Sequence, residues 1–416
     1  MNRNIKELLK AMITREASDL HLKAGSPPGF RVNGKLEPEE GAAALSAEDV
    51  RTLIDQIVND DQRETYEREY ELDFSLGIPG VARFRVNIFH QRGTCASVMR
   101  KIPVDVPPLE SLGFPDVVRN LCCKPRGLVL VTGPTGSGKS TTLAAMVDYI
   151  NRNEKAHILT LEDPIEFMHK DKNCFVNQRE IGSDSKSFGK ALRSALREDP
   201  DVILVGEMRD LETISLAVTA AETGHLVFGT LHTTSAIQTM DRIVDVFPHE
   251  AQQQIRTQLS NTLQGVLSQV LLPKIGGGRA CAQEIMIGTG GVRNLIREGK
   301  TSQLLNMLQT GGAYGMQTLE TALEQLISSK QITPDTALAK ANNPASLRKG
   351  LARMGFKVPD GEAPREKPSS EEIAQRFAQA TGEKKEKEPA AARLVTQSAG
   401  GGGDGFEQFR KQRKPR

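Results

Sequence analysis

The stretch Gly127-Leu-Val-Leu-Val-Thr-Gly-Pro-Thr-Gly-Ser-Gly-Lys-Ser-Thr-Thr142 decides the fold of this chain. The apolar run at residues 128–131 predicts a fully buried strand, and residues 141–150 predict a helix. Between them, residues 133–140 follow the pattern G-x-x-x-x-G-K-S, which predicts a loop whose backbone N–H groups surround a phosphate. Because both flanking elements are present, we predict a nucleoside triphosphate site.

The loop also predicts a role for each of its residues. Lys139 is expected to reach the β- and γ-phosphates, and the hydroxyl of Ser140 is expected to hold Mg²⁺. The helix that follows adds the positive end of its dipole. The expected contacts of ATP are Gly133, Pro134, Thr135, Gly136, Ser137, Gly138, Lys139, Ser140 and Thr141.

Hydrolysis needs an acid close to the γ-phosphate, and two buried strands end in acidic residues. Residues 201–207, Asp-Val-Ile-Leu-Val-Gly-Glu, place Glu207 at the carboxyl end of a strand. Ligands of open α/β sheets bind at this edge, so we predict that Glu207 is catalytic and also holds the metal. Glu162 and Asp163 end another strand, and these residues suit a strand-end turn equally well.

His232 follows a third strand, 226–230, and hydroxyl residues flank it. A lone histidine is more often structural, but the three strand ends are expected to meet in one crevice. We therefore predict that His232 contacts or senses the γ-phosphate.

Arginines of the N-terminal region form a further candidate group. Arg83 and Arg85 alternate with apolar residues in a predicted strand at 81–89, and Arg92 and Arg100 lie nearby. No acidic residues stand opposite them in the sequence. Two interpretations remain open: a solvated strand face, or guanidinium groups that reach a bound γ-phosphate.

The order of elements predicts two domains, a linker and a tail. Residues 1–101 combine amphipathic helices with alternating strands, which predicts an α+β domain. Three prolines make residues 102–108 an extended linker. Buried strands alternate with helices across 109–350, which predicts an α/β domain with a parallel sheet covered on both faces. Residues 351–416 predict a disordered tail with a transient helix at 371–379.

Composition narrows the class of protein. The net charge of +2 and the aromatic content of 4% argue against a nucleic-acid partner. The five cysteines are scattered, as expected for a reducing cytoplasm, and the charged N-terminus does not read as a signal peptide. No apolar run approaches the length of a membrane span, so we expect no direct membrane insertion.

Four motifs in this order, GPTGSGKST, LEDPIEF, ALREDPDVILVGEMRD and TGHLVFGTLHT, closely resemble the secretion-type ATPases that power type IV pili and type II secretion. The resemblance spans roughly residues 19–332. It is closest to the retraction ATPases of pili, because a long N-terminal extension and a tetracysteine insert are missing. Residues 292–298 also resemble the signature helix of that group.

The resemblance implies a RecA-like P-loop NTPase domain, a smaller PAS-like N-terminal domain and a ring-shaped homohexamer. It implies that Glu207 is the Walker B acid, Glu162 the Asp-box acid and His232 the His-box residue. Arg83, Arg85 and Arg100 carry over as contacts to phosphate. The implied activity is Mg²⁺-dependent ATP hydrolysis that drives pilus retraction, through an inner-membrane pilus platform protein.

Other functions remain open at this stage. Within the family, the alternatives are a pilus assembly or type II secretion ATPase and an accessory retraction ATPase. Outside it, a RecA-like motor on nucleic acid would need basic or aromatic pore loops. A nucleotide-binding adaptor that does not hydrolyse would not need the complete set of acids.

Overall fold

The computed structural model describes residues 4–103 and 105–356. Their strands form one sheet of six strands and one of seven. The predicted linker at 102–108 begins at the last residue of β6 (Thr94–Ile102) and ends before the 3-10 helix η1 (Leu109–Leu112). The last helix, α14 (Pro344–Arg353), runs past the predicted boundary at residue 350. Most of the predicted tail, including the helix at 371–379, lies outside the described residues.

The six-stranded sheet is antiparallel and has the order β3-β2-β1-β6-β5-β4. Asn33 and Gly34 have φ angles of 49° and 81°, which form the predicted hairpin turn. A strand that the sequence analysis did not anticipate, β4, forms one edge. The other strands are β1 (Asp19–Lys23), β2 (Gly29–Val32), β3 (Lys35–Pro38), β4 (Glu71–Ile78), β5 (Ala82–Gln91) and β6 (Thr94–Ile102).

Alternation along β5 separates a buried face from a polar one, as predicted. Phe84, Val86 and Ile88 are fully buried, whereas Arg85 on the opposite face is exposed. The buried face joins a core with the apolar sides of the helices α1 (Ile5–Thr14), α2 (Ala47–Asp55) and α3 (Asp60–Glu69).

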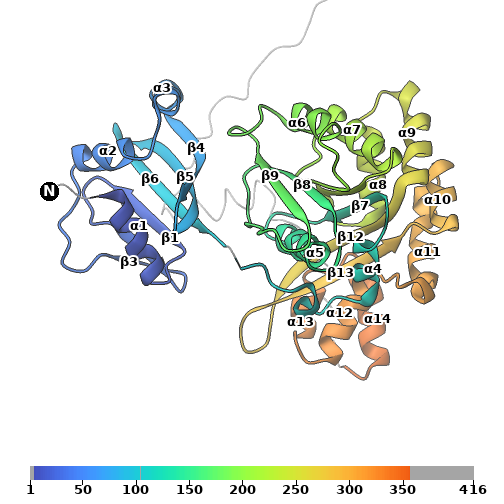
Figure 1. Cartoon of the computed structure of the whole chain (residues 1–416). Helices are drawn as coiled ribbons and strands as arrows, with labels where there is room; N and C mark the ends of the chain where they lie inside the picture. The colour runs from blue at the N-terminus through green and yellow to red at the C-terminus, as the bar shows by residue number, and fades with distance from the viewer. Residues whose placement is uncertain (1–3, 104, 357–416) are drawn as a thin grey trace, which may run out of the picture. The chain divides into compact units, whose positions relative to one another are not determined.

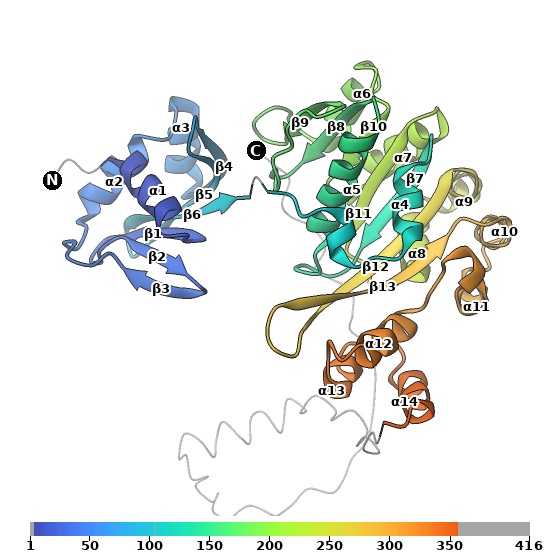
Figure 2. The same ribbon diagram turned by 60° about the horizontal axis from the view of Figure 1, so that its bottom comes forward.

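The seven-stranded sheet has the order β13-β12-β7-β11-β10-β8-β9. Its strands run parallel except β13, which pairs antiparallel with β12 (Figures 1 and 2). The edge strand β9 was not predicted. The strands are β7 (Gly127–Thr132), β8 (His157–Glu162), β9 (Phe175–Glu180), β10 (Val202–Val205), β11 (Leu226–Leu231), β12 (Leu263–Pro273) and β13 (Arg279–Ile287).

Helices cover both faces of this sheet, because its central strands are apolar on both sides. Val129 and Val131 pack on one face against α4 (Asp116–Cys122) and α5 (Lys139–Asn153). Leu128 and Leu130 belong to the core on the other face. That core includes residues of α6 (Phe188–Ala195), α7 (Leu211–Glu222), α8 (Ala236–Asp245), α9 (His249–Thr262), α10 (Gly290–Arg297) and α11 (Leu304–Thr310).

A smaller core joins the far ends of β12 and β13 to the last helices. Leu272, Ala280 and Ala282 are buried there against α12 (Leu319–Ser328), α13 (Pro334–Leu338) and α14. Within residues 4–103 and 105–356, no helix is both long and apolar enough to cross a membrane.

The carboxyl ends of the parallel strands lie at one edge of the sheet. The loop at 133–138 follows β7, Glu162 ends β8, Glu207 follows β10 and His232 follows β11. The fold therefore brings the predicted motifs to a single place.

The core of the N-terminal sheet gives a test of the fold. Phe84→Ala should lower the free energy of unfolding by about 3–5 kcal/mol, because a fully buried ring would leave a cavity. Urea denaturation followed by circular dichroism measures the change. Leu36→Ala is the control, since Leu36 is 50% exposed and should change stability by about 0.5 kcal/mol or less. Equal effects of the two substitutions would contradict the assignment of this core.

Candidate functional site

The phosphate-binding loop has the backbone that its glycines require. Gly133 has a φ of 144°, and a Cβ atom there would lie 2.3 Å from the carbonyl oxygen of Gln269. Gly138 has a φ of 91° and caps the N-terminus of α5, which begins at Lys139. Since both positions have positive φ and Gly133 has no room for a side chain, glycine is needed at each.

The side chain of Lys139 lies within the loop. Its Nζ donates to the carbonyl oxygens of Gly133, at 2.8 Å, and Pro134, at 3.2 Å. Burial lowers the pKa of Lys139 from its usual value, while the carboxylates of Glu207 and Glu166 act in the opposite direction. The ammonium group is therefore held at the loop that is predicted to bind phosphate.

Gln269 of β12 forms hydrogen bonds with the phosphate-binding loop and with the start of α5. Its Nε2 donates to the carbonyl oxygen of Ser137 at 2.9 Å, and its Oε1 accepts from Thr142 Oγ1 at 3.0 Å. Gln269 is only 3% exposed, so both bonds are shielded from water. The shape of the loop thus depends on the neighbouring strand as well as on its own glycines.

Glu207 and His232 meet at the edge of the sheet, as predicted from their places after β10 and β11. His232 Nε2 lies 3.1 Å from Glu207 Oε1. The same oxygen accepts a hydrogen bond from Arg209, and Thr230 donates to the carbonyl of Gly206 just before Glu207. The histidine and the arginine hold the carboxylate of Glu207, which lines the same cavity as the phosphate-binding loop.

Glu162 lies at the end of β8 and lines the same cavity. One of its oxygens accepts from Thr160 Oγ1 at 2.7 Å and from Gln178 Nε2 at 3.2 Å. Burial raises the pKa of Glu162, and these two hydrogen bonds oppose that shift.

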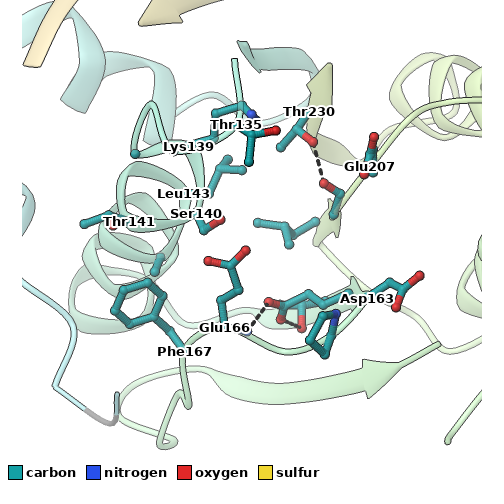
Figure 3. A pocket seen from close by; sticks show the side chains of 18 of the residues that line it. Thr135, Lys139, Ser140, Thr141, Leu143, Asp163, Glu166, Phe167, Glu207 and Thr230 are labelled. Atoms are coloured by element: carbon teal, nitrogen blue, oxygen red, sulfur yellow. Dashed lines mark hydrogen bonds between the residues drawn. The ribbon is translucent and has the colours of Figure 1, made fainter. Parts of the chain in front are cut away.

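Glu166 is a functional candidate that the sequence analysis did not single out. Figure 3 shows its side chain in the cavity, directed toward Ser140. Its position in the motif LEDPIEF, four residues after Glu162, is the signal that could have indicated it. The loop after β8 therefore contributes two carboxylates to the site.

These groups surround a cavity of about 520 Å³ that is lined by the phosphate-binding loop, Glu162, Glu166, Glu207 and His232. The hydroxyl of Ser140 and the carboxylates are hard oxygen donors, which suit Mg²⁺. No group of three or more His, Cys, Asp or Glu side chains among the described residues is arranged to hold a metal ion. A hydroxyl and carboxylates of this kind suit Mg²⁺ that keeps ligands from phosphate oxygens and water.

The three predicted phosphate-binding arginines have carboxylate partners. Arg83 donates to Glu180 at 3.1 Å, Arg85 to Asp73 at 3.4 Å, and Arg100 to Asp19 at 2.6 Å. The expectation that no acids stand opposite them was wrong. The strand β4 brings Asp73 beside Arg85, and the pairing of β1 with β6 brings Asp19 beside Arg100.

The two arginines of the predicted signature helix differ in environment. Arg293 is half-buried, and its Nη2 donates to the carbonyl oxygen of Leu263 at 3.0 Å. Arg297 is exposed and donates to Asn294 within the helix. Arg293 thus anchors α10 to the start of β12, and only Arg297 presents its charge on the surface.

A largely parallel sheet with a phosphate-binding loop after β7 and an acid after β10, with β11 between these two strands, defines a RecA-like P-loop NTPase domain. The family model described as "Type II/IV secretion system protein" matches residues 1–354. The chain belongs to this family.

Several relatives are similar over most of the chain. The type IV pilus retraction ATPase PilT of Pseudomonas aeruginosa PAO1 is 57% identical over 344 residues, which cover 83% of this chain and all of PilT. A twitching motility protein of Neisseria gonorrhoeae is 53% identical, over 77% of this chain and 86% of its own. The type IV pilus ATPase PilU of P. aeruginosa is 40% identical, over 82% and 90%.

A solved structure shares the fold. The crystal structure of the pilus retraction motor PilT with bound ADP superposes with a TM-score of 0.79 at 48% identity. The match covers 84% of this chain and all of that one. The family, its relatives and this structure together identify the chain as an ATPase of the secretion family.

The loop contacts of Lys139 yield a prediction. Lys139→Ala should reduce ATP hydrolysis to the background level while thermal melting stays unchanged, because the backbone of the loop keeps its glycines and its support from Gln269. Release of inorganic phosphate measures the effect. Lys190→Ala, an exposed change on α6, is the matched control. Hydrolysis near the parent rate in Lys139→Ala would contradict the assignment.

Proposed function

We propose that this chain is an ATP-hydrolysing motor that drives retraction of type IV pili. The observation that carries the proposal is the meeting of Lys139, Glu207 and His232 around one cavity, in a chain that is 57% identical to PilT over the full length of PilT. The convergence supports ATP hydrolysis, and the relatives support the use of its energy.

The chemistry is attack of water on the γ-phosphate, and the cavity supplies the groups that this reaction needs. Glu207 orients the attacking water, assisted by Glu162 and Glu166 from the loop after β8. Lys139 balances the charge that develops on the phosphoryl oxygens. Mg²⁺, held by Ser140 and Glu207 together with phosphate oxygens, would neutralise further charge when bound.

The contact between His232 and Glu207 supports a role for the histidine in this reaction. A ring nitrogen 3.1 Å from the carboxylate restricts the orientation of Glu207. The contact between His232 and Glu207 therefore depends on whether the carboxylate binds water or metal. His232 lies on the loop that leads into α8.

Arg83, Arg85 and Arg100 supply positive charge to a γ-phosphate in this proposal. Guanidinium groups bind carboxylate and phosphate with the same geometry, so each arginine can exchange its carboxylate partner for phosphate. Such an exchange would tie the N-terminal domain to the state of the nucleotide, which is the link that a motor requires.

The assembly in which this motor acts is also a proposal. The resemblance to the family supports a homohexamer that works peripherally at the inner membrane, on a pilus platform protein. The accessory alternative is less well supported, because identity to PilU is 40% against 57% to PilT. The type II secretion alternative has weaker support still, with 32% identity to HxcR of P. aeruginosa.

A charge-removing change tests the acid. Glu207→Gln should keep ADP binding within about twofold and lower kcat by about a hundredfold or more, because the amide keeps the shape but cannot orient water as a carboxylate does. Isothermal titration and steady-state kinetics separate the two quantities. Glu250→Gln, an exposed acid of α9, serves as the control. Loss of ADP binding with kcat unchanged would make Glu207 structural.

Deletion of the gene distinguishes retraction from assembly. Loss of a retraction motor should give cells with many surface pili and no twitching, whereas loss of an assembly ATPase gives cells without pili. Pilus counts by electron microscopy and the diameter of twitching zones measure these outcomes. Re-expression of the parent chain should restore twitching, and Glu207→Gln should not. Cells without surface pili would overturn the proposed function.

A further inference from the structure

The edge strand β9 places an amide side chain beside the catalytic loop. In the parallel pairing of β8 with β9, Gln178 is the register partner of Thr160, and Glu180 is the partner of Glu162. Residues two apart on a strand share a face, so Gln178, Thr160 and Glu162 all project from the same side of the sheet. No motif in the sequence points to Gln178.

Gln178 makes three hydrogen bonds to the segment that begins at Glu162. Its Nε2 donates to Glu162 Oε1 at 3.2 Å and to the carbonyl oxygen of Phe167 at 2.8 Å. Its Oε1 accepts from the backbone N–H of His169 at 2.8 Å. One side chain therefore uses both donors and its acceptor to bind the two ends of the loop that carries Glu166.

The middle of this loop is held by two further, longer hydrogen bonds, both from backbone N–H groups to carboxylate oxygens. The backbone N–H of Ile165 donates to Glu180 Oε2 at 3.2 Å, and that of Glu166 donates to Glu162 Oε2 at 3.5 Å. The second of these hydrogen bonds depends on Glu162, whose other oxygen is bound to Gln178. Removal of Gln178 would therefore release Phe167 and His169 directly and Glu166 indirectly.

We propose that Gln178 is a positioning residue that sets the place of Glu162 and Glu166 in the cavity, an inference that rests on the proposed function of these two acids in ATP hydrolysis. A displacement of about 1 Å at a reacting group costs up to about a hundredfold in rate. The hydrogen bonds of Gln178 within the described residues go to Glu162, Phe167 and His169, and none of them goes to the phosphate-binding loop between β7 and α5. The residue therefore affects turnover and not nucleotide binding.

The test compares two variants of the full chain. Gln178→Leu removes all three bonds at similar volume, and Gln178→Glu keeps an acceptor for His169 but loses both donors. We expect each to lower kcat by about tenfold or more, with the Kd for ADP and the melting temperature close to those of the parent. Asn177→Leu is the matched control, since Asn177 is exposed on the opposite face of the same strand.

Three outcomes decide the proposal. A lower kcat at unchanged ADP affinity in both variants supports it. A parent-like kcat in both, or a weaker ADP affinity in proportion to the loss of kcat, overturns it. Glu162→Gln and Glu166→Gln are measured alongside: if both retain the parent kcat, the proposed role of these acids fails, whereas if they lose activity and Gln178→Leu does not, only the role of Gln178 fails.

Discussion

The backbone of β12 packs directly against the phosphate-binding loop, and this contact constrains the whole candidate site. The carbonyl oxygen of Gln269 occupies the space in which a side chain at Gly133 would begin, and the side chain of Gln269 binds Ser137 and Thr142. The sheet therefore sets the shape of the loop. The parallel pairing of β7, β11, β10 and β8 then aligns His232, Glu207 and Glu162 with that loop at one edge.

The parts of the site that depend on strong local patterns could be predicted from the sequence. The apolar runs of β7, β10 and β11 are buried on both faces, and at their carboxyl ends they are followed by a glycine loop, by Gly206 and Glu207, and by His232 respectively. The topology of parallel sheets brings such ends together. The meeting of Glu207 with His232, at 3.1 Å, is therefore a consequence of pattern and topology alone.

The parts of the site that could not be predicted from the sequence depend on polar edge strands, because the sequence patterns of such strands are weak. The strand β9 has the sequence Phe-Val-Asn-Gln-Arg-Glu, which has no alternation of apolar and polar residues, and it pairs with β8. The role of Gln178 depends on the register of this pairing, which the sequence does not show. Asp73 escaped notice as the partner of Arg85 because β4 was not predicted. Glu166 lay within a recognised motif, but the course of its loop depends on Glu180 and Gln178, which are distant in sequence.

The position of Lys139 has a consequence for how nucleotide affinity is understood. Its ammonium group already donates to two carbonyl oxygens. A phosphate that binds to Lys139 therefore exchanges these neutral acceptors for charged oxygens. The net gain is the difference between the two sets of bonds, and the ammonium group already makes charge-assisted bonds to the carbonyl oxygens before phosphate binds. The loss of nucleotide affinity on substitution of Lys139 therefore measures this net gain. The net gain is smaller than the free energy of the ammonium–phosphate contact itself.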